Sequence, residues 1–116
     1  MKKIYFIALV SVAVLVLANC GSSKKVAAAA PAKLTYQSNV QALVEAHCSP
    51  CHIPAKGGRK KAYDTYASVQ GDIDEIIRRI ELEPGQRGFM PFKNAKLSDS
   101  TIAQFKQWKA DGMLEK

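Results

Sequence analysis

The chain has 116 residues, enough for one small domain, with 17 Lys and Arg against 10 Asp and Glu. The formal charge of +7 at pH 7 would suit a protein that binds nucleic acid, but most of the excess lies before residue 34. From residue 34 to the end there are twelve Lys and Arg against ten Asp and Glu, so we expect no nucleic-acid partner.

Residues 1–19 have the anatomy of a secretory signal peptide. Lys2 and Lys3 supply a positive start, and the run from Ile4 to Ala18 is apolar or small and too short to span a bilayer comfortably. A plain transmembrane anchor is the alternative, and it is disfavoured because no charged stop-transfer segment follows. We therefore expect the chain to be exported from the cytoplasm.

The stretch Leu17-Ala18-Asn19-Cys20 resembles a bacterial lipobox, in which the cysteine becomes the lipidated first residue of the mature protein. Asn19 departs from that pattern, because Gly, Ala or Ser usually precedes the cysteine. Cleavage after Ala18, with Val16 and Ala18 as the small-residue pair, is the alternative and would release a soluble protein. Lipidation is favoured because an exported chain has little other use for an unpaired Cys20. It predicts a membrane anchor on the periplasmic or cell-surface side.

Residues 20–33 are predicted to be a tether. After the cysteine they contain almost no large apolar side chains, and they cannot bury enough surface to repay the entropy of ordering. A flexible chain of this length has a root-mean-square reach of about 20 Å. The domain of residues 34–116 would therefore stay close to the membrane and remain free to turn.

Residues 34–116 carry three helical patterns and no alternating strand pattern, so the predicted fold class is all-α. The first pattern lies between residues 38 and 48, where apolar positions recur three and four apart along one face. Thr35 or Ser38 can cap its start with a side-chain oxygen. This helix would deliver the chain into a cysteine-containing segment. Its apolar positions are Val40, Leu43 and Val44, and the face continues to His47.

A second helix is predicted after a loop at residues 53–61, which Gly57-Gly58 and the basic residues around them indicate. The helix is expected to begin as a short turn at residues 64–68 and to end near Glu83, because the following Pro84 stops it. One face of it is aliphatic and the other mostly charged. The aliphatic positions are Val69, Ile73, Ile76, Ile77 and Ile80.

The last helix has the clearest boundaries. Ser98 is the predicted N-cap, and Gly112 lies past the end. Leu97 before the cap and Ile102 inside the helix form a hydrophobic staple. Residues 86–96 have no sustained period and are predicted to be an ordered loop. The inward face of the helix consists of Ile102, Phe105 and Trp108.

The sequence HCSPCH at residues 47–52 is the most specific feature of the chain. In a c-type haem site, two thiols separated by two residues bond to the two vinyl groups, and the next residue points an imidazole at the iron. Cys48, Cys51 and His52 meet that requirement, and Cys-x-x-Cys-His is a haem-attachment signature. We therefore expect one haem c, attached through both cysteines.

Three other kinds of site use cysteines at this spacing. A structural zinc ion needs four ligands, and the chain offers only His47 beyond the motif. A thioredoxin-like thiol pair normally begins a helix after a strand, whereas here a helix is predicted to run into the cysteines. A structural disulfide also suits an oxidising compartment. These alternatives stay open, with haem favoured.

Met90 is the predicted second axial ligand of the iron. It lies in an irregular loop, precedes Pro91, which fixes the backbone, and has Phe89 and Phe92 on either side to cover a ring. A methionine is more often a core filler, which is the alternative here. Met113, near the C-terminus, is the weaker candidate.

With Cys48-Ser49-Pro50-Cys51-His52, the Met90-Pro91 loop and an aromatic C-terminal helix, residues 35–113 resemble a monohaem class I cytochrome c domain. The resemblance implies three main helices wrapped around one covalent haem. It also implies that the first helix packs across the last, with Leu43 or Val44 against Phe105 and Trp108. In this family a proline carbonyl often orients the axial histidine. Pro54 matches that role poorly, so the partner of His52 stays unassigned.

The expected function is one-electron transfer, because His52 and Met90 together leave the iron no open position. The expected partners are redox donor and acceptor proteins of a respiratory chain, with the membrane reached through the lipid anchor. A haem-based catalytic or sensing module with a labile sixth ligand is one alternative, and a thiol-disulfide oxidoreductase is another. A cluster of basic residues has three alternative roles: plain solvation at the surface, hydrogen bonds to the haem propionates, or steering toward an acidic redox partner. Its members are Lys56, Arg59, Lys60, Lys61 and Arg87.

Overall fold

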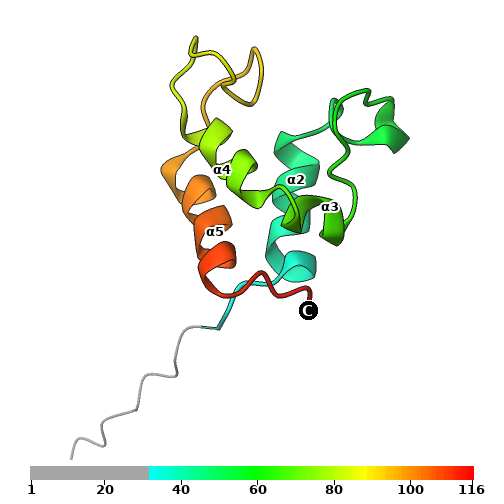
Figure 1. Ribbon diagram of the computed structural model, residues 1–116, viewed down its shortest axis with the longest axis vertical. Helices are drawn as coiled ribbons and strands as arrows, with labels where there is room; N and C mark the ends of the chain where they lie inside the picture. The colour runs from blue at the N-terminus through cyan, green and yellow to red at the C-terminus, as the bar shows by residue number, and fades with distance from the viewer. Residues whose placement is uncertain (1–31) are drawn as a thin grey trace, which may run out of the picture. The chain divides into compact units, whose positions relative to one another are not determined.

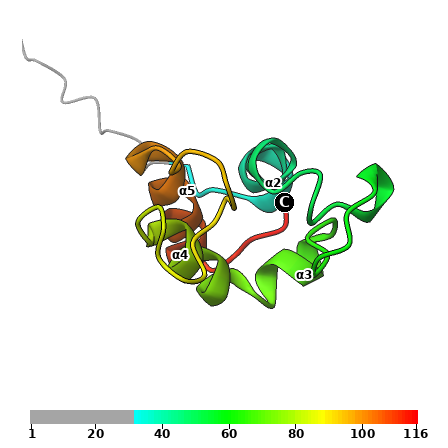
Figure 2. The ribbon, with the colours of Figure 1, turned by 90° about the horizontal axis from the view of Figure 1, so that it is seen from above.

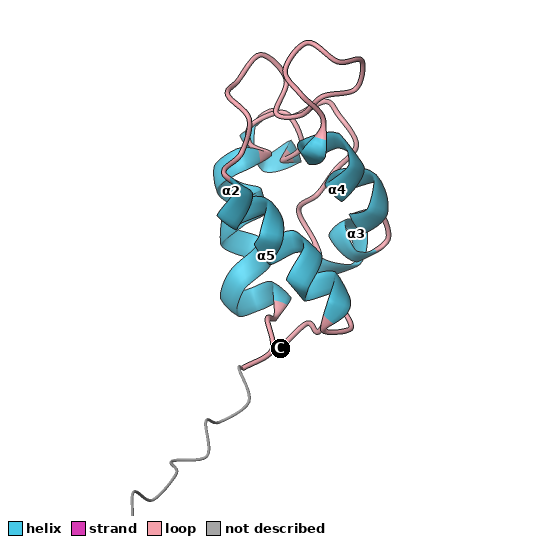
Figure 3. Cartoon of the chain, turned by 90° about the vertical axis from the view of Figure 1, so that its left-hand side faces the viewer, coloured by secondary structure: helices cyan, strands magenta, loops and turns pink. Residues whose placement is uncertain are grey.

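The structure is a computed structural model that describes residues 32–116. The predicted signal peptide, Cys20 and nearly all of the predicted tether lie outside the described residues. Within residues 32–116 the chain is mostly helical and contains no strand, which confirms the all-α class (Figure 3). No helix of this region is long and apolar enough to cross a membrane. The elements are η2 (Tyr36–Val40), α2 (Gln41–His47), η3 (Pro54–Lys56), α3 (Tyr66–Gln70), α4 (Ile73–Glu81) and α5 (Asp99–Ala110).

The first predicted helix is present and starts with a π-helical turn, η2, that continues directly into α2. Thr35 is the cap, because its hydroxyl accepts a hydrogen bond from the backbone N–H of Ser38 at 3.3 Å. Val40 and Val44 are buried along one face, as their spacing predicts. The Cys48 N–H donates to the carbonyl of Val44 at 2.8 Å, so α2 ends at the motif.

The prediction of a single second helix is wrong in one respect. The segment forms two helices, α3 and α4, with a break at Gly71 and Asp72. Thr65 and Ser68 form a capping box at the start of α3. Asp72 has φ −122° and ψ 12°, outside helical geometry. Its carboxylate is bonded to side chains in the preceding loop, and that tertiary contact is the physical reason for the break. The described part of the chain therefore has four α-helices where three main helices were expected.

The last helix, α5, agrees with its sequence signals. The Ser98 hydroxyl accepts from the N–H of Thr101 at 3.2 Å, which confirms the cap. Leu97 and Ile102 are both buried, as a staple requires. Gly112 follows the end with a φ of +95°, a conformation that favours glycine.

The helices share one hydrophobic core, to which α5 contributes the largest buried side chains. Trp108 and Phe105 are the largest side chains with almost no exposure, and Val44 of α2 belongs to the same cluster. The ring of Tyr36 in η2 lies 6.1 Å from that of Trp108, centroid to centroid. The first helical segment therefore packs against the last, as expected, while Leu43 lies at the margin of the core. On the other side α4 lies next to α5 (Figures 1 and 2).

The two ends of the described chain are joined at one end of the domain. The N–H of Leu34 donates to the Asp111 carboxylate at 2.8 Å, and that of Tyr36 donates to the carbonyl of Leu114 at 2.8 Å. The two long loops, between α2 and α3 and between α4 and α5, lie at the opposite end (Figures 1 and 3). This arrangement separates the point where the chain enters the domain from the loops that carry the predicted site.

Candidate functional site

A cavity of about 640 Å³ lies between the motif, α4, the loop before α5 and α5 itself. Its volume is within the usual range for a small-molecule or cofactor site. Four separate stretches of the chain contribute walls, so the cavity exists only in the folded domain. The lining includes His47, Cys48, Cys51 and His52 at the motif, Ile76, Arg79 and Ile80 on α4, Met90, Pro91 and Phe92 on the loop, and Leu97 and Phe105 at α5.

The cavity brings together the four residues predicted from the sequence within the domain. Cys48, Cys51, His52 and Met90 all line it, although Met90 is 38 residues beyond His52 in the chain. Met113, the weaker candidate, does not line the cavity. It is half-buried near the C-terminus, where its carbonyl accepts a hydrogen bond from the hydroxyl of Tyr66 at 2.9 Å. Cys20, the predicted lipidation site, lies outside the described residues.

The loop after the motif folds back onto it. The N–H of Lys60 donates to the carbonyl of Cys51 at 3.1 Å, and that of Tyr63 donates to the carbonyl of His52 at 2.9 Å. Gly58 makes this close approach possible, because a Cβ there would lie 2.4 Å from the carbonyl oxygen of Pro50 and 2.6 Å from that of Cys51. The path of the loop is therefore set by backbone contacts with the motif.

The imidazole of His52 is oriented by a backbone carbonyl. Its Nδ1 donates to the carbonyl oxygen of Lys61 at 2.6 Å. A carbonyl only accepts, so Nδ1 carries a proton, and in the neutral imidazole Nε2 then has the lone pair that can bind a metal. The ring of Tyr63 stacks on the imidazole, with centroids 4.6 Å apart and planes at 12°. The partner left unassigned from the sequence is thus the Lys61 carbonyl, and no side-chain identity signals it.

Asp72 ties together both residues that hold His52. Its carboxylate accepts a hydrogen bond from the Tyr63 hydroxyl and pairs with the Lys61 ammonium at 2.6 Å. Burial, and then the bond to Asp72, raise the pKa of Tyr63. For Asp72, burial acts to raise the pKa, but the bonds from Lys61 and Tyr63 outweigh it and hold the pKa below its usual value. Asp72 is therefore ionised in the fold and fixes the loop beside the imidazole.

We expect Asp72→Asn to lower the free energy of unfolding by about 1–2 kcal/mol, because a charged acceptor of two hydrogen bonds is replaced by a neutral amide. Denaturant unfolding of the purified protein measures this. Asp74→Asn is the matched control: its carboxylate is 78% exposed and pairs with Lys109, so its loss should cost at most about 0.5 kcal/mol. Equal losses of unfolding free energy in the two variants would contradict the role of Asp72.

The same variant carries a pH signature. Because the pKa of Asp72 is lower in the fold than in the unfolded chain, its stabilising effect is fully present above the unfolded value of about 3.9 and is lost as pH falls through the folded value. The stability difference between wild type and Asp72→Asn should therefore be largest near neutral pH and shrink below about pH 4. A difference that stays constant to low pH would argue against this linkage.

The two thiols of the motif differ in environment. Cys48 is half-buried, and burial raises its pKa to about 11. Cys51 is exposed, and neither is joined in a disulfide. A thiol with a raised pKa holds little thiolate at neutral pH and is a poor nucleophile for disulfide exchange. In residues 32–116 no group of three His, Cys, Asp or Glu side chains is placed to hold a metal ion.

The loop that carries Met90 is fixed at the end of α4. The N–H of Met90 donates to the carbonyl of Arg79 at 3.2 Å, which anchors the residue beside the cavity. The expectation that two aromatics cover the site needs correction. Phe89 is buried but is not part of the cavity wall, and Phe92 lines the cavity while its side chain is 67% exposed.

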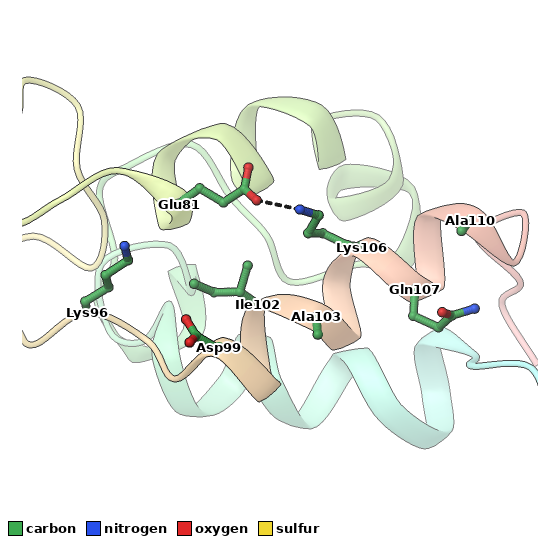
Figure 4. A pocket seen from close by; sticks show the side chains of 8 residues that line it. All are labelled: Glu81, Lys96, Asp99, Ile102, Ala103, Lys106, Gln107 and Ala110. Atoms are coloured by element: carbon green, nitrogen blue, oxygen red, sulfur yellow. Dashed lines mark hydrogen bonds and ion pairs between the residues drawn. The ribbon is translucent and has the colours of Figure 1, made fainter.

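A second hollow, of about 650 Å³, lies between α4 and α5 (Figure 4). Two charged side chains that face it, Glu81 and Lys106, are paired with each other at 2.7 Å. It holds no cysteine, histidine or methionine. Of the two hollows, only the cavity at the motif combines thiols, an imidazole and a thioether.

Comparison with family models, with curated proteins and with solved structures finds no match to this chain. The functional interpretation therefore depends on the residues and geometry of the cavity.

Proposed function

We propose that this protein is a one-electron carrier with a single c-type haem. Cys48 and Cys51 would hold the haem covalently, and His52 and Met90 would bind its iron. The main support is that all four side chains line one cavity, although Met90 is 38 residues beyond His52 in the chain. We further propose that the protein is exported and held at a membrane by lipid on Cys20.

The chemistry of the cavity suits a haem. Two thiols and the imidazole of His52 lie at one side of the cavity, and the thioether of Met90 comes from the loop before α5. The walls between them carry aliphatic and aromatic side chains such as Ile76, Ile80 and Phe105, which match the apolar faces of a porphyrin. Polar side chains at the cavity, including Lys60 and Arg79, suit the two propionates.

A bound haem supplies reversible one-electron chemistry at its iron. The chain's own residues do the rest. The Lys61 carbonyl keeps the proton of His52 on Nδ1, so that Nε2 is available as a ligand. The backbone bond from Met90 to Arg79 holds the thioether loop in place. Buried side chains of α4 and α5 exclude water from one wall of the cavity. A dry wall would favour the less charged, reduced state of a bound haem iron.

The alternatives have less support. Thiol-disulfide exchange needs an activated thiol, and Cys48 has a raised pKa in a half-buried position. A catalytic or sensing haem needs an open or weakly held sixth position, and Met90 lines the same cavity as His52. Both observations favour electron transfer as the role of the site.

The proposal is tested on protein made in a host with cytochrome c maturation machinery. We expect an intact mass larger than that of the processed polypeptide by one haem, and a colour that survives acid-acetone extraction. A weak far-red absorption band of the oxidised protein would report the iron–thioether bond. A bare polypeptide mass from this host would refute the proposal.

A further inference from the structure

The imidazole of His52 is held by two contacts of different kinds. The hydrogen bond from Nδ1 to the Lys61 carbonyl, 2.6 Å long, fixes one atom of the ring. Carbonyl oxygens accept hydrogen bonds over a broad range of angles, so this bond alone leaves the plane of the imidazole free to tilt. The ring of Tyr63 lies nearly parallel to the imidazole, with centroids 4.6 Å apart and planes at 12°. A flat neighbour at stacking distance resists that tilt, so Tyr63 sets the plane.

Tyr63 is itself held at its backbone and at the far end of its ring. It is 7% exposed and belongs to the hydrophobic core. Its N–H donates to the carbonyl of His52 at 2.9 Å, which ties its backbone to the residue on which its ring stacks. Its hydroxyl donates to the carboxylate of Asp72. A side chain locked by packing and by a hydrogen bond in this way has little freedom to change rotamer.

The carboxylate of Asp72 is turned toward the loop and away from its own helix. Asp72 is the N-cap residue of α4, a position from which Asp usually accepts a hydrogen bond from the first turn. Here it makes no capping bond. One oxygen accepts from Tyr63 and the other pairs with the Lys61 ammonium at 2.6 Å, and the side chain is only 15% exposed. The contacts therefore form a closed ring that begins and ends at the imidazole and runs through Lys61, Asp72 and Tyr63.

We propose that Tyr63 is a positioning residue for the iron ligand: its ring fixes the plane of the His52 imidazole, and Asp72 holds the ring in place. This role rests on the proposed function, because it concerns the imidazole that would bind the haem iron. Tyr63 and Asp72 both line the cavity, so they would lie beside the haem. The plane of an imidazole ligand decides which iron orbitals it overlaps. A fixed plane lets the iron change oxidation state without rearranging this ligand.

An aromatic ring in a core also contributes by packing alone, and Tyr36 supplies the comparison for that effect. Tyr36 is 6% exposed, its ring lies 6.1 Å from that of Trp108, and it does not line the cavity. Tyr63→Leu and Tyr36→Leu therefore remove the same kind of buried ring. Only the first removes the stack on His52.

The test uses the haem-loaded protein from a maturation-competent host and records NMR spectra of its oxidised form. The hyperfine-shifted haem methyl resonances depend on the orientation of the axial ligand planes, and an imidazole that samples several orientations narrows their spread. We expect a narrowed spread in Tyr63→Leu. Tyr63→Phe keeps the ring and loses only the bond to Asp72, so it should narrow the spread less. Tyr36→Leu should lose stability but keep the wild-type spread.

Three results would overturn the proposal. They are a wild-type spread in haem-loaded Tyr63→Leu, a narrowing in Tyr36→Leu as large as in Tyr63→Leu, and a narrowing in Tyr63→Phe as large as in Tyr63→Leu. In the second case general loosening of the core is the cause, and in the third the stack is not.

If Tyr63→Leu retains no haem, Asp72→Asn decides, with Asp74→Asn as its control. Asp72→Asn leaves the ring in place but weakens its anchor, so it should narrow the spread relative to the control, and an unchanged spread would overturn the proposal. Haem content is measured in every sample. A wild type without haem refutes the proposed function, whereas haem-loaded variants with unchanged spectra refute the positioning role alone.

Discussion

Replacing Cys48 and Cys51 together with alanine is expected to leave a chain without native helicity and without a sharp thermal transition. A domain of this size buries a limited share of its surface, and such small domains are only marginally stable. Here one side of the core also borders an open cavity of about 640 Å³. The apolar side chains that line it lack neighbours on that side, and core side chains normally have close packing partners all round.

The walls of that cavity explain why haem attachment and folding should be linked. Ile76 and Ile80 of α4, and Phe105 of α5, are buried residues that also line it. Filling the space with the apolar faces of a haem gives these side chains packing partners on the cavity side. Without covalent attachment that side has no packing partner, and the packing of α4 against α5 loses part of its support.

Circular dichroism against temperature measures this effect, with both variants produced in the same maturation-competent host. Ser49→Ala is the matched control, because it lies between the cysteines and leaves both thiols in place. It should keep the haem, the helicity and a cooperative transition. A double cysteine variant with native helicity and a sharp transition would show that the domain folds on its own core.

Local signals explain most of what could be predicted about the fold. The caps Thr35 and Ser98 are set by side chains and backbone groups a few residues apart, so the sequence is sufficient to find them. The break before α4 could not be predicted in this way. Val69 and Ile73 are four residues apart and continue the same apolar face across Gly71. The apolar periodicity therefore gives no sign of the break between α3 and α4.

In the candidate site, too, some residues are indicated by local sequence and others are selected only by the fold. Cys48, Cys51 and His52 carry their chemistry in their spacing, and Met90 is indicated by its loop and by Pro91. The Lys61 carbonyl could not be predicted, because every residue has a carbonyl and only the path of the folded loop selects this one. That path is set by backbone contacts with the motif and is held in addition by Asp72, whose bonds to the loop are tertiary contacts.

Replacing Met90 with alanine is expected to abolish the far-red band of the oxidised protein and to lower the reduction potential by on the order of 0.1 V or more, within the range of about 0.8 V that axial ligands span. A thioether is a weak donor that favours the reduced iron, so its loss removes that preference. Within residues 32–116, Met90 is the methionine that lines the cavity with His52. The backbone bond to Arg79 does not depend on its side chain, so the loop should keep its position in the variant.

Met113→Ala is the matched control for this measurement. Met113 is partly buried against the core and does not line the cavity, so removing its side chain should cost some stability but leave both the band and the potential in place. Absorption spectra and a potentiometric titration of the two variants decide between the methionines. If the band survived in Met90→Ala and vanished in Met113→Ala, the sixth ligand would have to come from the C-terminal segment. The cavity at the motif would then have to rearrange to reach it.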